Sequence, residues 1–555
     1  MSNINIEELR QKFHENFAKN RGLTPEQMNN LNRVRMNQLH DFSQAENAMA
    51  FISFMYDNRD KEITIFGDYD ADGVLATTVA YTGLNILGIG SVINVHVPTR
   101  ADGYGISPDS VDKLVAKFPN TELILTVDNG VVGYDGVQHA KDLGIAVAVS
   151  DHHLGRDTDT VADVVVDINR PTDMYPFKGL SGTGVIWKLW DLYAKTYEPD
   201  KVAEIVKLID LVGVSVVSDV MPAIDENRLF LVSALRAINK NARPQWQILK
   251  DVLADARRRV PDEVDEEFIG FTLAPLINSA NRVTDSPLLA YQAFMTSNDT
   301  YMDIYLTELL ALNNQRKDEV NAVTRKITKQ IYETYTTLPH ALVIVDDIRL
   351  GYMGLIANSL MTEFKVPVIV GAEHNGMVHS SARSLPGINL VEALQDIDVV
   401  ESVGGHAMAG GVSFKAENRE ALEQAFSDKI AHMAVVQPEV MSDLTFVYDE
   451  HDNVWTWQDK IVTPQTLIAL IPELNAYKPY GEALPAPVVL FKQAVVSNYF
   501  SMSEGVHSKF TAGGVTFIRW RDYGKLESLV GSKIDVMGTL SVNEFRGNRT
   551  PQVML

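Results

Sequence analysis

The sequence has no cysteine among its 555 residues. This absence excludes disulfide bridges, thiolate zinc sites and cysteine nucleophiles, but it says nothing specific about the cellular compartment. The chain also lacks an apolar run long enough to span a bilayer, and its first residues lack the basic and apolar regions of a secretory signal. We therefore expect a cytoplasmic protein that has no membrane partner.

Positive charge is scarce as well, because 49 lysine and arginine residues stand against 72 aspartate and glutamate residues, giving a formal net charge of −23. Nucleic-acid phosphates favour a basic surface, so this balance on its own argues against a nucleic-acid-binding protein. Bound metal ions would neutralise part of the acid, however, and charge can differ between domains. Residues 492–549 are locally positive, with eight basic and five acidic side chains.

The length exceeds what a single hydrophobic core supports, and the pattern of elements changes along the chain. Between residues 46 and 235 apolar strands alternate with helical patterns, which predicts a parallel sheet with helices on both faces. The predicted strands are 62–66, 92–97, 123–127, 145–150 and 164–166. A second α/β pattern starts near residue 340, and short strands with polar turns dominate from about residue 438.

Acidic side chains gather where three of the predicted strands end. The clusters are Asp68, Asp70 and Asp72 after the first strand, Asp128 after the third, and Asp151-His152-His153 after the fourth. Neighbouring carboxylates repel one another, and a hard divalent cation with oxygen ligands would hold them together. A solvated acidic turn explains the first cluster alone equally well. Ligands bind beyond the carboxyl ends of parallel strands, so three clusters at that edge favour one shared metal site.

A mostly apolar helix is predicted from residue 204 to residue 220, and it carries two acids. Burying an unpaired carboxylate costs several kcal/mol, so Asp219 at the helix end needs a partner and could complete the metal site. Asp210 is more simply a surface acid or a structural hydrogen-bonding group.

Two later stretches offer groups that could bind phosphate. The Gly-rich turn around Gly404-Gly405-His406 would let the backbone approach a phosphate, with Arg383 and His406 supplying cationic or hydrogen-bonding groups, although a tight strand connection explains it too. A long helix ending near residue 335 has a basic face that either faces solvent or lines a nucleic-acid path. Its basic residues are Arg316, Lys317, Arg325, Lys326 and Lys329.

The C-terminal strands are typical of a small β-barrel such as an OB-fold, which binds single strands by stacking bases on aromatics along a basic groove. Aromatic residues of an exposed type accompany the local positive charge there, and about half of them are expected in the core. They are Tyr499, Phe510, Trp520, Tyr523 and Phe545.

Together these stretches resemble the DHH phosphoesterase superfamily, and within it the RecJ-like exonucleases that are specific for single strands. The resemblance runs in consistent order from about residue 50 to the C-terminus. Three positions depart from the family pattern: Leu276 replaces a usual arginine, and Asn281 and Ser215 each replace a usual glycine. The matching residues include Asp68-Tyr69-Asp70-Ala71-Asp72-Gly73, Arg100, Asp102-Gly103-Tyr104-Gly105, Asp128-Asn129-Gly130, Asp151-His152-His153, Ser181-Gly182, Asp219, Asn227-Arg228, Ala382-Arg383-Ser384, Gly404-Gly405-His406 and Pro479-Tyr480-Gly481.

The resemblance implies an α/β fold in which a parallel-sheet DHH domain and a smaller α/β DHH-associated domain are joined by a long helical connector, with a C-terminal OB-like β-barrel. The expected segments are an N-terminal helical leader (1–45), the DHH catalytic domain (46–235), the helical connector (236–335), the DHH-associated substrate-binding domain (336–437) and the OB-fold-like nucleic-acid-binding domain (438–555).

The resemblance also implies two-metal phosphodiester hydrolysis, and the mixed oxygen and imidazole shell suits Mn²⁺, with Mg²⁺ as a substitute. Asp128 would bridge the two ions, and His153 would contact the scissile phosphate or act as an acid. The expected catalytic residues are Asp128, His152 and His153. The expected metal ligands are Asp68, Asp70, Asp72, Asp128, His152 and Asp219. The expected substrate-binding residues are Arg100, Tyr104, Asn278, Arg282, Arg383, Ser384, Gly404, Gly405 and His406.

The activity implied is 5′→3′ release of mononucleotides from single-stranded DNA in recombination and repair, by a monomer that works beside a single-strand-binding protein and a helicase. One alternative is an oligoribonucleotide or cyclic-dinucleotide phosphodiesterase of the same superfamily, but such relatives are generally shorter and lack the OB-like part. A catalytically inactive DNA-binding scaffold is the other alternative. Inactive relatives lose metal ligands, whereas every expected ligand is present here.

Overall fold

The computed structural model describes two compact units. One unit combines Met1–Gln38, Pro222–Arg228 and Glu439–Leu555, and the other combines Leu39–Met221 and Leu229–Pro438. No helix in the described part of the chain is both long and apolar enough to cross a membrane. The described residues are 2, 4–31, 33, 35–103, 105–155, 160–258, 260–433, 441–503, 506–520, 522, 524–545 and 547–555.

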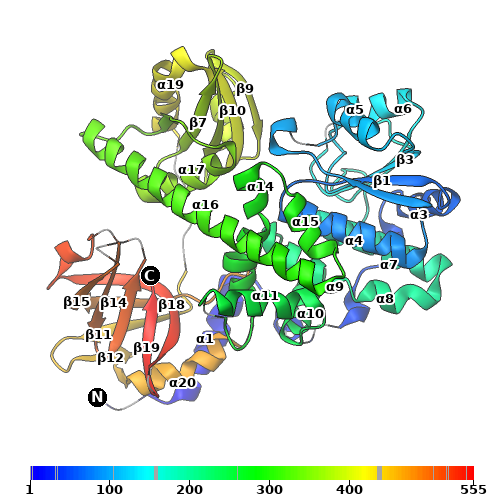
Figure 1. The fold of residues 1–555 in the computed structure, drawn as a ribbon. Helices are drawn as coiled ribbons and strands as arrows, with labels where there is room; N and C mark the ends of the chain where they lie inside the picture. The colour runs from blue at the N-terminus through cyan, green and yellow to red at the C-terminus, as the bar shows by residue number, and fades with distance from the viewer. Residues whose placement is uncertain are drawn as a thin grey trace. The chain divides into compact units, whose positions relative to one another are not determined.

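The larger unit begins with a five-stranded parallel sheet in the order β2-β1-β3-β4-β5 (Figure 1). Its strands are β1 Glu62–Phe66, β2 Val92–His96, β3 Leu123–Val127, β4 Ala146–Asp151 and β5 Val164–Asp167. All five predicted strands are present, and their bounds differ from the prediction by no more than one residue. Central parallel strands are covered on both faces, so they consist of continuous apolar runs that the sequence displays directly.

Helices cover both faces of this sheet (Figure 1). They are α3 Ala48–Asp57, α4 Ala71–Leu87, α5 Pro108–Lys117, α6 Tyr134–Asp142 and α7 Gly182–Tyr197. Leu114 from α5 and Val137 from α6 are buried against Ile124 and Val147 of the sheet, which forms the core on one face. The chain leaves β1 toward β2 on one side and resumes at β3 on the other. The carboxyl ends of β1 and β3 therefore flank the switch point where such sheets bind ligands.

A helical region links this sheet to the second one. It comprises α8 Val202–Val206, α9 Ile209–Ser218, α10 Asp225–Asn239, α11 Pro244–Asp255, α12 Glu266–Phe268, the π-helical turn η5 Ile269–Leu273, α13 Ala274–Ile277, α14 Ser279–Thr284, α15 Leu288–Met295 and α16 Asp299–Thr334. The prediction of one continuous helix over residues 204–220 is wrong. Lys207 and Leu208 donate to carbonyl groups three residues back, so α8 ends in a tight turn before α9 starts.

The second sheet of the larger unit has the order β6-β7-β8-β10-β9, in which only β6 and β7 are parallel. The strands are β6 Leu342–Val345, β7 Val368–His374, β8 Met377–Arg383, β9 Val400–Gly405 and β10 Ala409–Lys415. The helices are α17 Leu350–Phe364, α18 Leu390–Leu394 and α19 Arg419–Ala431. Separate hydrophobic clusters form on the α17 side and on the α18–α19 side, so this sheet too is covered on both faces.

The smaller unit is built on a mostly antiparallel nine-stranded sheet in the order β13-β12-β11-β14-β18-β19-β17-β16-β15. Its strands are β11 Leu444–Asp449, β12 Val454–Trp457, β13 Lys460–Val462, β14 Val489–Val495, β15 Ser497–Met502, β16 His507–Ala512, β17 Val515–Arg519, β18 Lys533–Phe545 and β19 Asn548–Met554. Its helices include α1 Ile6–Asn20, α2 Pro25–Leu31 and α20 Pro464–Leu474. Of the five C-terminal aromatics, about half of which were expected in the core, Phe510 is buried, Tyr499 is half-buried, Trp520 and Phe545 are exposed, and Tyr523 lies outside the described residues.

Segments far apart in the sequence hold the smaller unit together. Phe13 and Phe17 of α1 are fully buried in the same hydrophobic cluster as the strands. The buried guanidinium group of Arg228 donates to the carbonyl groups of Leu31, Tyr477 and Pro479 at 2.6, 2.9 and 2.9 Å. The N-terminal helices and the short segment Pro222–Arg228 are thus structural parts of the β unit.

Candidate metal centre and substrate-binding residues

Loops at the carboxyl edge of the first sheet, together with the start of α4 and the end of α9, bring the predicted ligands together. The loop after β1 carries Asp68 and Asp70, and Asp72 lies in the first turn of α4. Asp70 also caps α4 by accepting a hydrogen bond from the backbone of Gly73 at 3.0 Å. Asp128 follows β3 with a φ of +61°. A Cβ atom on Gly182 would lie 2.4 Å from Asp128 Oδ1, so only glycine lets the start of α7 approach that carboxylate so closely.

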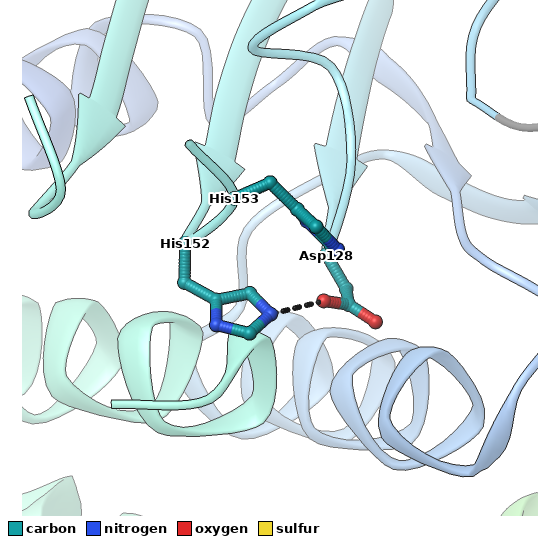
Figure 2. A group of neighbouring side chains, drawn as sticks. All are labelled: Asp128, His152 and His153. Atoms are coloured by element: carbon teal, nitrogen blue, oxygen red, sulfur yellow. Dashed lines mark ion pairs between the residues drawn. The ribbon is translucent and has the colours of Figure 1, made fainter. Parts of the chain in front are cut away.

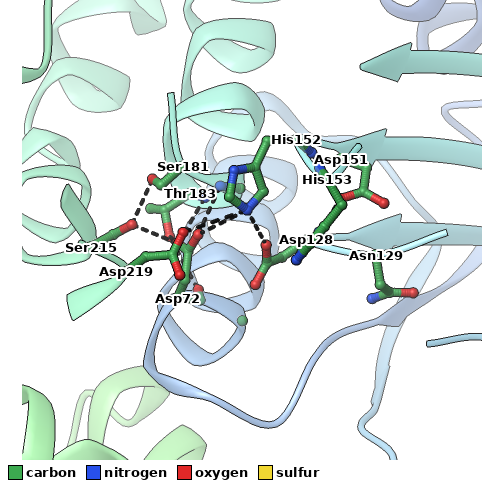
Figure 3. A network of polar contacts seen from close by, with 12 residues as sticks. Asp72, Asp128, Asn129, Asp151, His152, His153, Ser181, Thr183, Ser215 and Asp219 are labelled. Carbon is green, nitrogen blue, oxygen red and sulfur yellow. Dashed lines mark hydrogen bonds and ion pairs between the residues drawn. The ribbon is translucent and has the colours of Figure 1, made fainter. Parts of the chain in front are cut away.

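The six predicted ligands and His153 form three overlapping groups of potential metal-binding side chains. In each group the ligand atoms lie within 4.8 Å of one another. Figure 2 shows the first group at the ends of its strands, and Figure 3 shows how the second group faces it. The groups are Asp128 with His152 and His153, Asp72 with His152 and Asp219, and Asp68 with Asp70 and Asp128.

His152 points between carboxylates from three different elements (Figure 3). Its Nε2 atom lies 3.1 Å from Asp128 Oδ1, 3.6 Å from Asp219 Oδ2 and 3.8 Å from Asp72 Oδ2. Burial lowers the pKa of this imidazole, which favours the neutral form that coordinates metals. One ring nitrogen thus faces oxygen atoms of all three carboxylates.

The described residues provide few hydrogen bonds and little positive charge to balance these buried carboxylates. Asp68 Oδ1 is buried and has no hydrogen-bond partner among the described residues, and the buried Asp128 Oδ1 has only its ionic contact with His152 Nε2 there. Burial raises the pKa of Asp128 well above its usual range, and the charges of Asp72, Asp70, Asp68 and Asp219 raise it further. Burial and the neighbouring acids likewise raise the pKa of Asp219 to about 9. Unpartnered buried oxygens and mutual repulsion are what bound divalent cations would relieve, so the residues fit a metal site.

Sequence reasoning missed the neutral groups that hold Asp72. Its Oδ1 atom accepts hydrogen bonds from the hydroxyl groups of Thr183 and Ser215, each at 2.5 Å, and its Oδ2 atom accepts one from the backbone of Gly182 at 2.8 Å. Ser181 extends this network, since its hydroxyl oxygen lies 2.6 Å from that of Ser215. The Ser181-Gly182 match and the Ser215 departure from the family pattern were the signals that could have pointed to this network.

Asp151 orients the second histidine instead of joining a metal-binding group. Its Oδ1 atom lies 2.8 Å from His153 Nδ1 and accepts the backbone N–H groups of both histidines. Burial alone would lower the pKa of His153, but the hydrogen bond and negative charge of Asp151 outweigh it and raise that pKa to about 9. Asp151 therefore favours the protonated form of His153, which is suited to a phosphate group.

The three predicted substrate-binding arginines lie on the side of the metal centre. Arg100 stacks over the ring of Tyr69 at 4.8 Å, next to the carboxylates of the first loop. Arg282, on α14, donates to the carbonyl group of Gly351 at 3.3 Å. Burial and the charges of Arg100, Arg316 and Arg383 lower its pKa to about 10, while the charge of Asp70 opposes that shift. The structure thus gathers these arginines around the acidic edge of the sheet.

The other predicted substrate-binding residues differ in burial and lie on different elements. Ser384 is buried and its hydroxyl donates to the carbonyl group of Ile388 at 3.1 Å, so it shapes the turn after β8. Asn278 is half-buried between α13 and α14, and Gly404, Gly405 and His406 are exposed where β9 turns into β10. Tyr104 lies outside the described residues.

All three departures from the family pattern, Ser215 included, are interior positions. Leu276 is fully buried, and Asn281 is buried with an Oδ1 atom that has no hydrogen-bond partner in the described part of the chain. Neither side chain adds a charge next to the acidic edge.

Three protein families match successive parts of the chain. Residues 62–213 match the DHH family, N-terminal domain, residues 339–432 match the DHHA1 domain, and residues 460–555 match the RecJ OB domain. Together they cover both sheets of the larger unit and most of the β unit.

Relatives extend the match over most of the chain. The single-stranded-DNA-specific exonuclease RecJ of Salmonella typhimurium is 30% identical over 528 residues, which cover 89% of this chain and 86% of that protein. The RecJ of Dickeya dadantii is 30% identical over 534 residues, covering 90% and 87%. The crystal structure of RecJ in complex with Mn²⁺ from Thermus thermophilus has the same fold, with a TM-score of 0.78, 23% identity, and coverage of 100% of this chain and 78% of that one. The chain therefore belongs to the RecJ family of DHH phosphoesterases.

Proposed function

We propose that this protein is a single-stranded-DNA-specific exonuclease that removes 5′-mononucleotides in the 5′→3′ direction during recombination and repair. The observation that carries the proposal is the set of three overlapping ligand groups centred on Asp128 and His152. The names of the RecJ relatives supply the substrate and the exonuclease activity. The polarity and the pathway rest on the family resemblance alone.

The three ligand groups would hold two divalent cations. Mn²⁺ would be preferred over Mg²⁺, because the donors include an imidazole. Asp68 and Asp70 would serve one ion, Asp72, His152 and Asp219 the other, and Asp128 both. When bound, the two ions supply activation of the attacking water and neutralisation of charge on the leaving oxygen. Asp72, held by Thr183 and Ser215, would present a fixed oxygen to its ion.

The remaining residues would act on the phosphodiester itself. His153, whose protonated form Asp151 favours, would donate a hydrogen bond from Nε2 to a phosphate oxygen or protonate the leaving group. Arg100, Arg282 and Arg383 would anchor the phosphate through charge-assisted hydrogen bonds, since each guanidinium is fixed by packing before substrate arrives. Asn278, Ser384 and the Gly404-Gly405-His406 turn would shape the surrounding site.

The wider organisation is part of the same proposal. We assign catalysis to residues 46–235, connection to 236–335, substrate binding to 336–437 and nucleic-acid binding to 438–555, to whose core the N-terminal helices α1 and α2 contribute. The protein would act as a monomer with a single-strand-binding protein and a helicase as partners.

End-labelled DNA tests the proposal directly. With Mn²⁺, a 5′-labelled single strand should release its label as a mononucleotide before a 3′-labelled strand does, and a blunt duplex should resist digestion. Asp128→Ala should reduce the rate by at least about a thousandfold, because it removes the shared ligand. The exposed acid Asp135 provides a charge-matched control, and Asp135→Asn should digest normally.

Three results would contradict the proposal. Unchanged digestion by Asp128→Ala would refute the metal assignment. Faster turnover of a short RNA or a cyclic dinucleotide than of long single-stranded DNA would identify a different phosphodiesterase. Binding of single strands without any Mn²⁺-dependent cleavage would identify a scaffold.

A further inference from the structure

Three basic side chains on or beside the middle of α16 have no acidic partner among the described residues. Arg316, Lys317 and Arg258 form no ion pair with a carboxylate in that part of the chain, although the protein carries a net charge of −23. Two other cations of the same helix are paired, since Lys326 lies 2.6 Å from Asp346 and Lys329 lies 3.7 Å from Glu333. Arg325 of the same helix also has no carboxylate partner among the described residues, and it donates to the carbonyl group of Asn321 at 3.3 Å. Lack of an acidic partner is therefore not confined to the three side chains, and what sets them apart is that they lie close to one another.

Neutral amide groups hold two of these cations in place. Asn313 Oδ1 accepts hydrogen bonds from Arg316 Nε at 3.2 Å and from Arg316 Nη2 at 2.8 Å. On the next residue of the helix, Asn314 Oδ1 accepts a hydrogen bond from Arg258 Nη2 at 2.6 Å. An amide oxygen fixes the guanidinium plane without neutralising its charge, so both groups remain positive and oriented.

One of these three cations, Arg316, lies close enough to Arg282 of the metal centre to interact with it electrostatically. Helix α14, which carries Arg282, packs against both α16 and α17. Burial lowers the pKa of Arg282, and the charges of Arg100 and Arg316 lower it further, so Arg316 lies within electrostatic range of the arginines at the metal centre. Burial and the charges of Arg258 and Arg316 also lower the pKa of Lys317. Arg282, Arg316, Lys317 and Arg258 thus form one series of like charges.

Such a series costs free energy in the absence of a partner, because like charges in partly buried positions repel one another. A bound polyanion removes that cost, and a phosphodiester backbone offers one negative charge per nucleotide. A single phosphate at the metal centre would leave the outer members of the series, Lys317 and Arg258, without a partner. The extended arrangement therefore fits several consecutive phosphates better than one.

We propose that Arg316, Lys317 and Arg258 form a phosphate-binding track that holds the backbone of a single strand beyond the nucleotide at the metal centre. This assignment rests on the proposed function, because it takes the 5′ end of the strand to lie at the acidic edge of the first sheet. The track contacts phosphates and no bases, so it binds strands of any sequence. It also explains how an acidic chain holds a polyanion in its larger unit.

Binding measurements on the full-length protein test the track without any cleavage. Fluorescence anisotropy in EDTA, with labelled oligo(dT) of 3 and 15 nucleotides, separates the contacts at the metal centre from those beyond it. Lys317→Gln and Arg258→Gln should each weaken binding of the 15-mer about fivefold and leave the 3-mer unchanged. Each should also reduce the slope of log Kd against log salt by about 0.7, the value for one lost phosphate contact on a single strand.

Lys329→Gln is the matched control, because it removes the same charge from the same helix about 18 Å further along, at the helical rise of about 1.5 Å per residue. It should bind both oligomers as the unaltered protein does. If Lys317→Gln and Arg258→Gln behave like Lys329→Gln, the track is refuted while the proposed exonuclease function stands. If the variants behave as expected but the unaltered protein with Mn²⁺ digests no single strand, the proposed function fails and the track remains as a binding surface.

Discussion

In the metal centre, uncharged hydroxyl groups hold the carboxylate of Asp72 in position for a metal ion. Asp72 lies at the start of α4, and the hydroxyl groups that hold it come from α7 and α9. Ser215 is notable because the family pattern usually has glycine there, and glycine has no side chain to donate. The hydroxyl group gives this chain one extra contact that fixes the carboxylate before an ion arrives.

Removing the Ser215 hydroxyl should therefore weaken metal binding. We expect Ser215→Ala to raise the dissociation constant for Mn²⁺ about tenfold, the lower end of the effect seen when groups that orient ligands are lost. Calorimetric titration of Mn²⁺ into the protein measures it. Ser218→Ala, on the same helix, removes a hydroxyl that donates only to the carbonyl group of Ser215 at 3.2 Å and should leave the constant unchanged. Equal constants for both variants would mean that Ser215 does not position Asp72.

A second residue, Asp167, makes the stability of the larger unit depend on pH. It lies at the end of β5, buried, with an Oδ2 atom that has no hydrogen-bond partner in the described residues. Burial raises its pKa to about 7, with a further contribution from the charge of Asp151. The ordinary value in an unfolded chain is about 3.9, so between pH 4 and pH 7, roughly, the folded state binds the proton more tightly. This group therefore lowers stability as the pH rises through that window.

Asp167→Asn should abolish that contribution. We expect the variant to melt a few degrees higher than the unaltered protein at pH 8 and at nearly the same temperature at pH 4, because protonated aspartate and asparagine are both neutral. Thermal melts across this pH range measure the difference. Asp200→Asn, at an exposed position, serves as the control and should follow the unaltered protein at every pH. A constant offset between Asp167→Asn and the unaltered protein would argue against titration of this carboxyl.

At the scale of elements, the sequence predicts buried strands well and junctions poorly. The mostly apolar runs that form β1 and β3 have bounds that match the prediction fully, because a strand covered on both faces is dominated by apolar residues. Because the strands are parallel, the sequence also predicts that the acids that follow them lie at the carboxyl edge of the sheet. Whether those acids bind metal as assigned stays a prediction, although the structure brings their oxygen atoms close together.

Local hydrogen bonds at one turn and contacts between distant elements account for what the sequence did not reveal. The break between α8 and α9 depends on hydrogen bonds that tighten one turn, and Lys207 and Leu208 are acceptable in a continuous helix. Similarly, the hydroxyl of Tyr291 on α15 donates to the carbonyl group of Asp68 at 2.5 Å. A lone tyrosine in an apolar helix resembles any core residue, so no local pattern identifies that contact. The sequence likewise left open which of the C-terminal aromatics are core residues, and Phe510 is buried because it packs in the hydrophobic cluster of the β unit.

At the scale of the whole molecule, the order of segments along the chain differs from their grouping in space. The β unit draws on both ends of the chain and on Pro222–Arg228, which follows shortly after Asp219. Cutting the chain at residue 45, as the predicted division suggests, would remove Phe13 and Phe17 from the core of the β unit. The N-terminal helix should therefore be needed for the stability of that unit, whatever else it does.

Phe17→Ala tests this dependence. The ring is fully buried, stacks on Tyr477 with centroids 4.7 Å apart, and lies under the guanidinium group of Arg21 at 3.7 Å. Truncating a buried phenylalanine costs about 3–5 kcal/mol, so amide exchange in β14 and β18 should become markedly faster. Exchange in β1 and β3 of the larger unit should not change. Phe500→Ala, which removes a ring that is 56% exposed, is the matched control. If Phe17→Ala left the exchange of β14 as slow as Phe500→Ala does, the N-terminal helix would be an appendage and not part of the core.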